Sequence, residues 1–165
     1  MVFLHGTSIM HSAGFGKTRE ERVKQVRRRR LSVLNYARYI PVGSVVNKLK
    51  NWVNQGAKIV YLSSHEKSKD VEKDKLVLNK YSFPKGEVLY RKNGETYKDV
   101  AEKVMPNILI EDDCESIGGK KEMTYTFIER GLKKKIKSIP VKEFGGIDHL
   151  PDSLEDLMKY KKSSS

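Results

Sequence analysis

Short apolar segments rich in β-branched residues recur along the chain, and each has the length and composition of a buried strand. The predicted strands are Val2 to Leu4, Lys58 to Leu62, Val88 to Tyr90, Asn107 to Ile110 and Lys137 to Val141. Apolar residues between them recur at helical spacing, and the predicted helices cover Val45 to Val53, Asp70 to Tyr81 and Tyr97 to Val104. This alternation is typical of parallel βαβ units with right-handed crossovers. The sequence predicts an α/β fold of the Rossmann-like, doubly wound type, with a mainly parallel five-stranded sheet and its first strand between the second and the fourth.

The segment between the first strand and the first long helix is too long for an ordinary connecting loop. It covers residues 8–40, and Thr18 with Glu21 has the sequence signature of a capping box at the start of a helix. We expect a small helical, cap-like insertion over the end of the first strand. The 165 residues suit one domain, assigned to residues 1–157, and the basic, serine-containing tail of residues 158–165 is predicted to be disordered.

The chain is basic, with 33 Lys and Arg against 21 Asp and Glu and a formal net charge of +12. Part of this charge is concentrated in Arg27 to Arg30, which could bind the backbone of a nucleic acid. A solvated basic surface is the favoured interpretation, because no nucleic-acid-binding motif accompanies the charge. Cys114 is the only cysteine, and no stretch approaches the ~20 apolar residues that span a bilayer. We therefore expect a soluble cytoplasmic protein with no membrane partner.

Polar residues gather where the predicted strands end. They are His5, Gly6 and Thr7 after the first strand, Ser63, Ser64 and His65 after the second, Glu111, Asp112, Asp113 and Glu115 after the fourth, and Glu143 to His149 after the fifth. In a doubly wound sheet the ligand binds in the crevice outside the carboxyl ends of the strands. The sequence therefore predicts one shared site at this edge of the sheet.

Two of these strand ends resemble motifs of the haloacid dehalogenase (HAD) superfamily of phosphohydrolases. The segment GAKIVYLSS is similar to that family's strand ending in Ser or Thr, and PNILIEDD is similar to its strand ending in paired acids. The resemblance covers residues 1–150 and implies a phosphorylated small molecule or nucleotide as the ligand. It also implies that Asp112 and Asp113 hold Mg²⁺, an ion that prefers hard carboxylate oxygens.

The same resemblance assigns residues to the phosphoryl group itself. It implies that Ser63 or Ser64 donates a hydrogen bond to a phosphoryl oxygen. It further implies that Lys98, or as a second choice Arg91, neutralises the charge that develops there.

The first motif departs from the family pattern, in which a nucleophilic Asp follows the first strand. The segment MVFLHGT can be aligned in two registers. The preferred register places His5 at the nucleophile and Thr7 two residues on, and it leaves four apolar residues for the strand. The other places Phe3 at the nucleophile and His5 at the acid/base position. Both lack the carboxylate, so the candidate catalytic residues are His5 and Thr7, with His5 as general base, phosphorylated nucleophile or metal ligand.

Three functions stay open on these residues. The first is a variant Mg²⁺-dependent phosphohydrolase acting on a phosphorylated small molecule or nucleotide. The second is a catalytically degenerate module that binds phosphate or nucleic acid through the same crevice and the basic insertion. The third is a hydrolase that depends on a transition metal held by Asp112 and by histidines drawn from His5, His11, His65 and His149.

Overall fold

The computed structural model describes residues 1–161 and contains a five-stranded sheet in which all neighbouring strands are parallel. The strands are β1 (Val2–Phe3), β4 (Ile59–Leu62), β5 (Gly86–Leu89), β6 (Ile108–Asp112) and β7 (Lys137–Val141), in the order β5-β4-β1-β6-β7. The predicted α/β fold with a parallel five-stranded sheet is confirmed. The predicted place of the first strand, between the second and the fourth, is confirmed as well.

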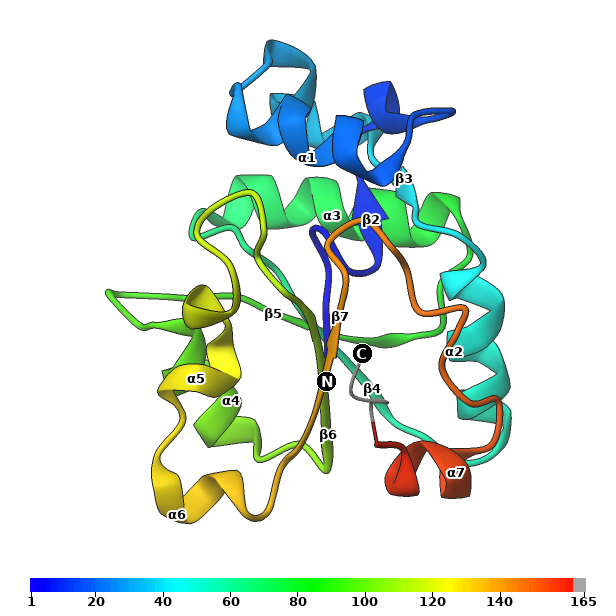
Figure 1. The fold of residues 1–165 in the computed structure, drawn as a ribbon, viewed down its shortest axis with the longest axis vertical. Coiled ribbons are helices and arrows are strands. Elements are labelled where there is room, and N and C mark those ends of the chain that lie inside the picture. Colours follow the sequence, from blue (N-terminus) through cyan, green and yellow to red (C-terminus); the bar gives the residue numbers. More distant parts are fainter. Residues whose placement is uncertain (162–165) are drawn as a thin grey trace.

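Helices cover both faces of this sheet (Figure 1). They are α2 (Val45–Asn54), α3 (Ser68–Lys80), α4 (Tyr97–Val104), α5 (Thr124–Phe127), α6 (Arg130–Lys133) and α7 (Leu154–Lys159). One core contains Trp52 of α2 and Val77 of α3, and a second contains Ala101 of α4. Successive strand residues point to opposite faces, which is why Leu109 and Ile110 of β6 belong to different cores. No helix within residues 1–161 combines the length and the apolar content needed to cross a membrane.

Local sequence explains where these helices begin and end. Thr96 caps α4: its hydroxyl accepts from the amide of Asp99 at 3.3 Å, and the Asp99 carboxylate accepts from the amide of Thr96 at 2.7 Å. Gly56 follows α2 with a φ of +98°, a conformation that glycine adopts without strain. It therefore turns the chain from α2 toward β4.

The insertion of residues 8–40 lies beyond the carboxyl ends of the strands (Figure 1). It contains the short 3-10 helices η1 (Ser12–Gly14), η2 (Leu31–Leu34) and η3 (Tyr36–Arg38) and the helix α1 (Arg19–Arg27). The predicted capping box is present, because Thr18 Oγ1 accepts from the amide of Glu21 and Glu21 Oε2 accepts from the amide of Thr18. The insertion is therefore helical and covers the edge where the site was predicted.

Several short elements were not predicted from the sequence. Strands β2 (Ile9–Met10) and β3 (Ile40–Pro41) pair antiparallel at the base of the insertion, and two residues are too few for a period-2 pattern. The single-turn helices α5 and α6 are too short for a helical one. Helix α7, capped by Ser153 and packed through Leu157, runs to Lys159 and so passes the predicted boundary at residue 157. Residues 162–165 of the predicted tail lie outside the described residues.

Candidate functional site

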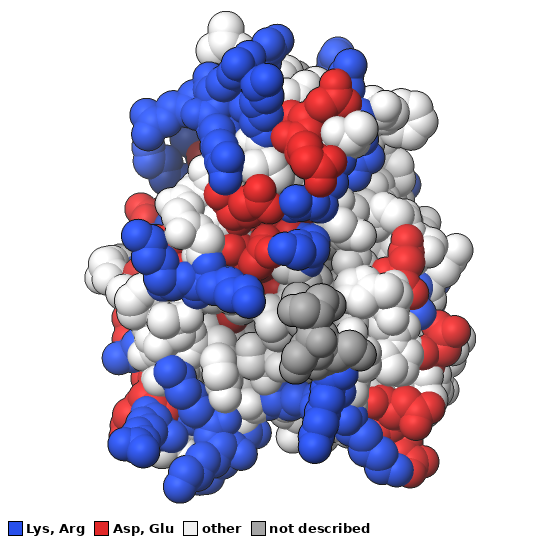
Figure 2. Space-filling model, in the orientation of Figure 1, with Lys and Arg blue, Asp and Glu red and all other residues white. Residues whose placement is uncertain are grey.

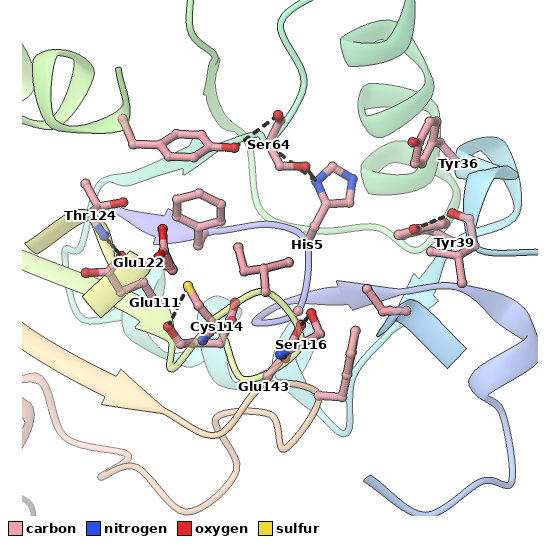
Figure 3. Close-up of a pocket in the computed structure, with 18 residues that line it drawn as sticks. His5, Tyr36, Tyr39, Ser64, Glu111, Cys114, Ser116, Glu122, Thr124 and Glu143 are labelled. Atoms are coloured by element: carbon pink, nitrogen blue, oxygen red, sulfur yellow. Dashed lines mark hydrogen bonds between the residues drawn. The ribbon is translucent and has the colours of Figure 1, made fainter. Parts of the chain in front are cut away.

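A pocket with a volume of about 250 Å³ lies between the strand ends and the insertion. His5 and Ser64 lie on one side of it and Ser116 and Glu143 on the other (Figure 3). The first pair follows β1 and β4, and the second pair lies in the connections that follow β6 and β7. The parallel sheet therefore brings four separate strand ends to one cavity.

The histidine side of the pocket consists of His5, Ser63, Ser64, His65 and Asp74. His5 Nδ1 lies 2.6 Å from Ser64 Oγ, and His5 Nε2 lies 3.1 Å from Asp74 Oδ1. Asp74 comes from α3 and has no solvent exposure. Its second oxygen, Oδ2, accepts a 2.6 Å hydrogen bond from Ser63 Oγ. The ring of His5 is thus held between a fully buried carboxylate and a serine of the pocket wall.

The backbone determines which nitrogen of His5 carries the proton. The amide of Ser64 donates to His5 Nδ1 at 3.3 Å, so Nδ1 is an acceptor. His5 Nε2 therefore carries the proton and donates it to Asp74 Oδ1, while the hydroxyl of Ser64 donates to Nδ1. This arrangement leaves the basic nitrogen of His5 facing Ser64.

His65 lies beside this group and is the least satisfied member of it. Its Nε2 is 3.6 Å from Asp74 Oδ1, and within the described residues this buried nitrogen has no hydrogen-bond partner. Burial, and then the charge of His5, lower the pKa of His65 below its usual value. His5, His65 and Asp74 each offer one ligand atom within 4.8 Å of the others. They could therefore hold an ion that accepts imidazole ligands, such as Zn²⁺.

The acidic side of the pocket consists of Glu111, Asp112, Asp113 and Glu143, all of them buried. Asp112 Oδ2 accepts from Thr7 Oγ1, and Oδ1 accepts from the amide of Cys114, both at 3.0 Å. Burial, and then the charge of Glu143, raise the pKa of Asp112 to about 7. Gly6 allows the close approach: its φ is +85°, and a Cβ there would lie 2.6 Å from Asp112 Oδ2.

The other three carboxylates are held mainly by backbone amides. Glu143 accepts from the amide and the hydroxyl of Ser116, both at 2.6 Å, and burial raises its pKa. Asp113 accepts from the amide of Glu143 at 3.0 Å and lies 3.3 Å from Lys142 Nζ. Glu111 accepts from the first two amides of α5, at 2.7 and 2.9 Å. Within residues 1–161, Lys142 is the only cation that forms an ion pair with these four acids, so the acidic side carries excess negative charge.

The structure places some of the predicted site residues on the pocket wall and others behind it. Those that line the pocket are His5, Ser64 and Asp112. Thr7, Ser63 and Asp113 lie behind them and are hydrogen-bonded to Asp112, Asp74 and the amide of Glu143. The first three can touch a ligand, and the second three hold the site in shape.

Neither candidate for the basic residue of the site, Lys98 or Arg91, is among the residues that line the pocket. Lys98 is a half-buried residue of α4. Arg91 Nη2 donates to the carbonyl of Ser64 at 3.2 Å, and its guanidinium lies 4.1 Å from the ring centre of Tyr97. Arg91 also pairs with Glu66 at 2.9 Å. It therefore supports the backbone of Ser64 from behind the pocket wall.

Two residues of the site were given no role from the sequence: Asp74 was not considered, and Glu143 was only one of the polar residues after the fifth strand. Asp74 carries a signal that could have revealed it, because it lies three residues from both Val71 and Val77 on the buried stripe of α3. A carboxylate on an apolar stripe needs polar partners in the fold, and these are Ser63 and the histidines. Glu143 follows a predicted strand, but no sequence pattern distinguishes it from a solvated loop acid.

The four histidines do not gather around Asp112 in the structure. His5 and His65 lie with Asp74 on the histidine side, whereas Asp112 lies on the acidic side. His11 is buried, and its Nε2 lies 2.8 Å from Gln25 Oε1 in the insertion. His149 is exposed, in the loop after β7.

The chain was compared with known proteins at three levels. Protein-family models, curated proteins and solved structures give no match to it. Membership of the HAD superfamily therefore stays a prediction based on the segments GAKIVYLSS and PNILIEDD.

Proposed function

We propose that the chain is a variant Mg²⁺-dependent phosphohydrolase that cleaves phosphate esters of a small molecule or nucleotide in the cytoplasm. The observation that carries the proposal is the pocket, in which a histidine–serine pair and buried carboxylates face one volume of about 250 Å³. Ligand pockets span roughly 300–1,000 Å³, so this one favours a compact substrate. Its place at the carboxyl ends of the strands is where doubly wound folds bind ligands.

The acidic side fits a hard dication at Asp112 and Glu143. Burial raises the pKa of both carboxyl groups, and within residues 1–161 neither forms an ion pair with a Lys or Arg side chain. Mg²⁺ binds carboxylate oxygens together with the phosphate oxygens of a substrate. We assign Asp113 a supporting role, because its carboxylate is turned toward the amide of Glu143 and toward Lys142.

The side chains of the pocket would then share the chemistry. Bound Mg²⁺ would neutralise the charge on the phosphoryl oxygens. His5 would accept, through Nδ1, the proton of the oxygen that attacks phosphorus, while Asp74 holds the ring and stabilises its positive charge. Tyr36 and Tyr39, whose rings lie 6.1 and 5.3 Å from that of His5, would shield this side from water.

Hydrolysis of a panel of phosphate monoesters tests this proposal. At least one ester should be turned over in Mg²⁺, and EDTA should stop the reaction. Asp112→Asn should lower kcat/KM by about 100-fold or more, as expected for loss of a group that stabilises transition-state charge. Asp156→Asn, at an exposed position of α7, is the control and should leave the rate unchanged. No turnover, together with no rise in Tm at millimolar Mg²⁺, would contradict the proposal.

The missing aspartate of the first motif gives a second test. If His5 acts as proposed, His5→Asp should lower activity, because Asp cannot link Asp74 to Ser64 and places a second negative charge beside a buried carboxylate. A rise in activity in the variant would show the opposite. His5 would then be a replacement that had disabled an ancestral aspartate-based site.

The basic insertion supports a second candidate, the binding of nucleic acid. Arg27 to Arg30 are all exposed, and Figure 2 shows Lys and Arg side chains gathered over the α1 end of the molecule. If they bind a phosphate backbone, affinity should fall steeply with salt, and each charge removed should reduce the slope of log K against log salt by about one. Unchanged binding after reversal of all four charges would leave this block as solvated surface.

A further inference from the structure

Asp74, His5 and Ser64 form a continuous hydrogen-bonded chain that ends in the pocket. Asp74 Oδ1 lies 3.1 Å from His5 Nε2, and His5 Nδ1 lies 2.6 Å from Ser64 Oγ. Exposure increases along this chain: Asp74 is fully buried, the His5 side chain is 13% exposed, and Ser64 is half-buried and lines the pocket. A buried carboxylate, an imidazole and an accessible hydroxyl in this order are the components of an activated serine nucleophile.

The tautomer of His5 suits the role of general base for Ser64. Because the amide of Ser64 donates to Nδ1, this nitrogen keeps its lone pair toward the Ser64 hydroxyl. It can therefore take the hydroxyl proton when Ser64 Oγ attacks. The resulting imidazolium is stabilised by Asp74, which already accepts the hydrogen bond from Nε2.

The backbone around Ser64 is fixed from behind. The carbonyl of Ser64 accepts hydrogen bonds from Arg91 Nη2 at 3.2 Å and from the hydroxyl of Tyr97 at 3.1 Å. Arg91 and Tyr97 also stack on one another. A nucleophile held in place before the substrate arrives avoids the cost of ordering it during the reaction.

We propose that Ser64 is a covalent nucleophile of this pocket, with His5 as its general base and Asp74 as the positioning residue. This inference rests on the proposed phosphohydrolase function and deepens it. Ser64 Oγ bonds to phosphorus, the bond from phosphorus to the alcohol oxygen breaks, and the hydroxyl proton passes to His5 Nδ1. His5 then gives this proton to the departing alcohol. A water molecule next attacks phosphorus while His5 removes its proton, and phosphate leaves as Ser64 Oγ recovers that proton.

The competing use of the same residues is a cation held by His5, His65 and Asp74. Its strength is that it gives the buried Nε2 of His65 a partner. Its weakness lies at His5: an imidazole that binds a metal through Nε2 carries its proton on Nδ1. That proton would face the amide hydrogen of Ser64, which the structure directs at Nδ1. The hydrogen-bond pattern therefore favours the nucleophile, and the cation becomes an outcome of the test.

Covalent labelling tests the inference directly. The full chain is incubated with diisopropyl fluorophosphate, in which fluoride is the leaving group, and the adduct is located by intact-mass and peptide mass spectrometry. One adduct is expected, on Ser64, and Ser64→Ala should abolish it. Ser68→Ala, at an exposed position at the start of α3, is the matched control and should label like the wild type. Absence of an adduct on Ser64, or an adduct elsewhere, would overturn the inference.

Two further variants separate chemistry from folding. Asp74→Asn should slow labelling by roughly 10⁴-fold, in line with loss of the orienting carboxylate in known triads, although Ser64 itself is intact. Ser64→Cys keeps the shape of the site, and its thiol should react with iodoacetamide about 10-fold or more faster than Cys114, because a neighbouring imidazole promotes the thiolate. Burial raises the pKa of Cys114, which makes it a slow internal reference. Equal rates for the two thiols would argue against an activating His5.

The result also distinguishes failure of this inference from failure of the proposed function. Phosphatase activity that is lost in Asp112→Asn but kept in Ser64→Ala leaves the function standing and removes the nucleophile. Labelling of Ser64 without turnover of any phosphate ester supports the nucleophile and contradicts the proposed phosphohydrolase function. Stoichiometric binding of Zn²⁺ that is lost in His65→Ala, with no labelling of Ser64, identifies the cation site and overturns the inference.

Discussion

The two sides of the pocket both contain buried carboxylates, but the groups that surround those carboxylates differ in charge. Asp74 on the histidine side and Asp112 on the acidic side each accept two hydrogen bonds, at 2.6 and 3.1 Å and at 3.0 and 3.0 Å. The difference lies in the neighbouring charge. Asp74 faces two imidazoles, whereas Asp112 faces Glu143, whose charge adds to burial in raising the pKa of Asp112 to about 7.

This comparison shows that hydrogen bonding alone does not reveal what a buried acid is for. On the histidine side Asp74, His5 and Ser64 form a continuous hydrogen-bonded chain, which favours precise placement of His5, and the buried Nε2 of His65 beside it has no hydrogen-bond partner within the described residues. On the acidic side the hydrogen bonds are as good, but like charges remain close together. That excess is relieved by a proton or by a cation, so the acidic side is suited to binding a metal.

The largest expected effect comes from removing the acid of the histidine side. Asp74→Ala leaves donors of Ser63 and His5 without partners in a fully buried position. Each such group costs ~1–3 kcal/mol, so the free energy of unfolding should fall by about 3 kcal/mol or more in urea denaturation. Glu72→Ala, at an exposed position of the same helix, should change it by less than about 0.5 kcal/mol. Equal effects of the two substitutions would show that the histidine side is not an integrated network.

The raised pKa of Asp112 on the acidic side should make the stability of the protein depend on pH. In the metal-free protein the pKa of Asp112 is about 7, against about 3.9 in an unfolded chain. The folded state therefore binds more protons between these values, and its stability falls as pH rises from about 4 to about 7. Relative to Asp112→Asn, which does not titrate, the wild type should lose about 2–3 kcal/mol between pH 5 and pH 8. A difference between the two proteins that is independent of pH would contradict the raised pKa, and saturating Mg²⁺ should reduce the loss.

The sequence could predict the fold because short apolar segments alternate with segments of helical periodicity along the chain. It located β4, β6 and β7 closely, but β5 begins at Gly86, two residues before the predicted Val88. Gly86 and Glu87 carry no apolar signal and join the sheet only through pairing with Ile59 and Val60 of β4. Strand ends that depend on a partner strand are not visible in a single segment.

Part of the site could be predicted because it follows from the topology of the sheet. The topology of a parallel sheet brings His5, Ser64 and Asp112 together whatever the loops do. Asp74 comes from within a helix, so a search of strand ends could not find it. Whether Lys98 or Arg91 reaches a bound phosphoryl group depends on packing that the sequence does not show. Arg91 packs on Tyr97 and donates to the Ser64 carbonyl, and neither residue is among those that line the pocket.

Gly6 joins the two sides, and its substitution should affect the acidic side selectively. A Cβ at Gly6 would lie 2.6 Å from Asp112 Oδ2, on a backbone with a φ of +85°. Gly6→Ala should therefore cost about 1–3 kcal/mol of stability and weaken Mg²⁺ binding, while labelling of Ser64 continues. Gly16→Ala is the control, because Gly16 also has a positive φ, +68°, but nothing lies within 4 Å of its Cβ. The stability lost in Gly6→Ala beyond that lost in Gly16→Ala, measured by thermal unfolding, is the effect of the contact with Asp112.

The smallest expected effect concerns Lys142, the one cation paired with the acidic side within residues 1–161. Its side chain is 60% exposed and lies 3.3 Å from Asp113 Oδ2, so the ion pair is screened by water and contributes about 1 kcal/mol or less. Lys142→Gln should therefore barely change the free energy of unfolding. It should instead strengthen Mg²⁺ binding slightly, because it removes a positive charge near Asp112 and Glu143, and this gain should shrink as salt is added. Calorimetric titration with Mg²⁺ at low and high salt measures both trends. Weaker Mg²⁺ binding in the variant would mean that Lys142 helps to assemble the acidic side, and the description of that side as an uncompensated cluster would then be wrong.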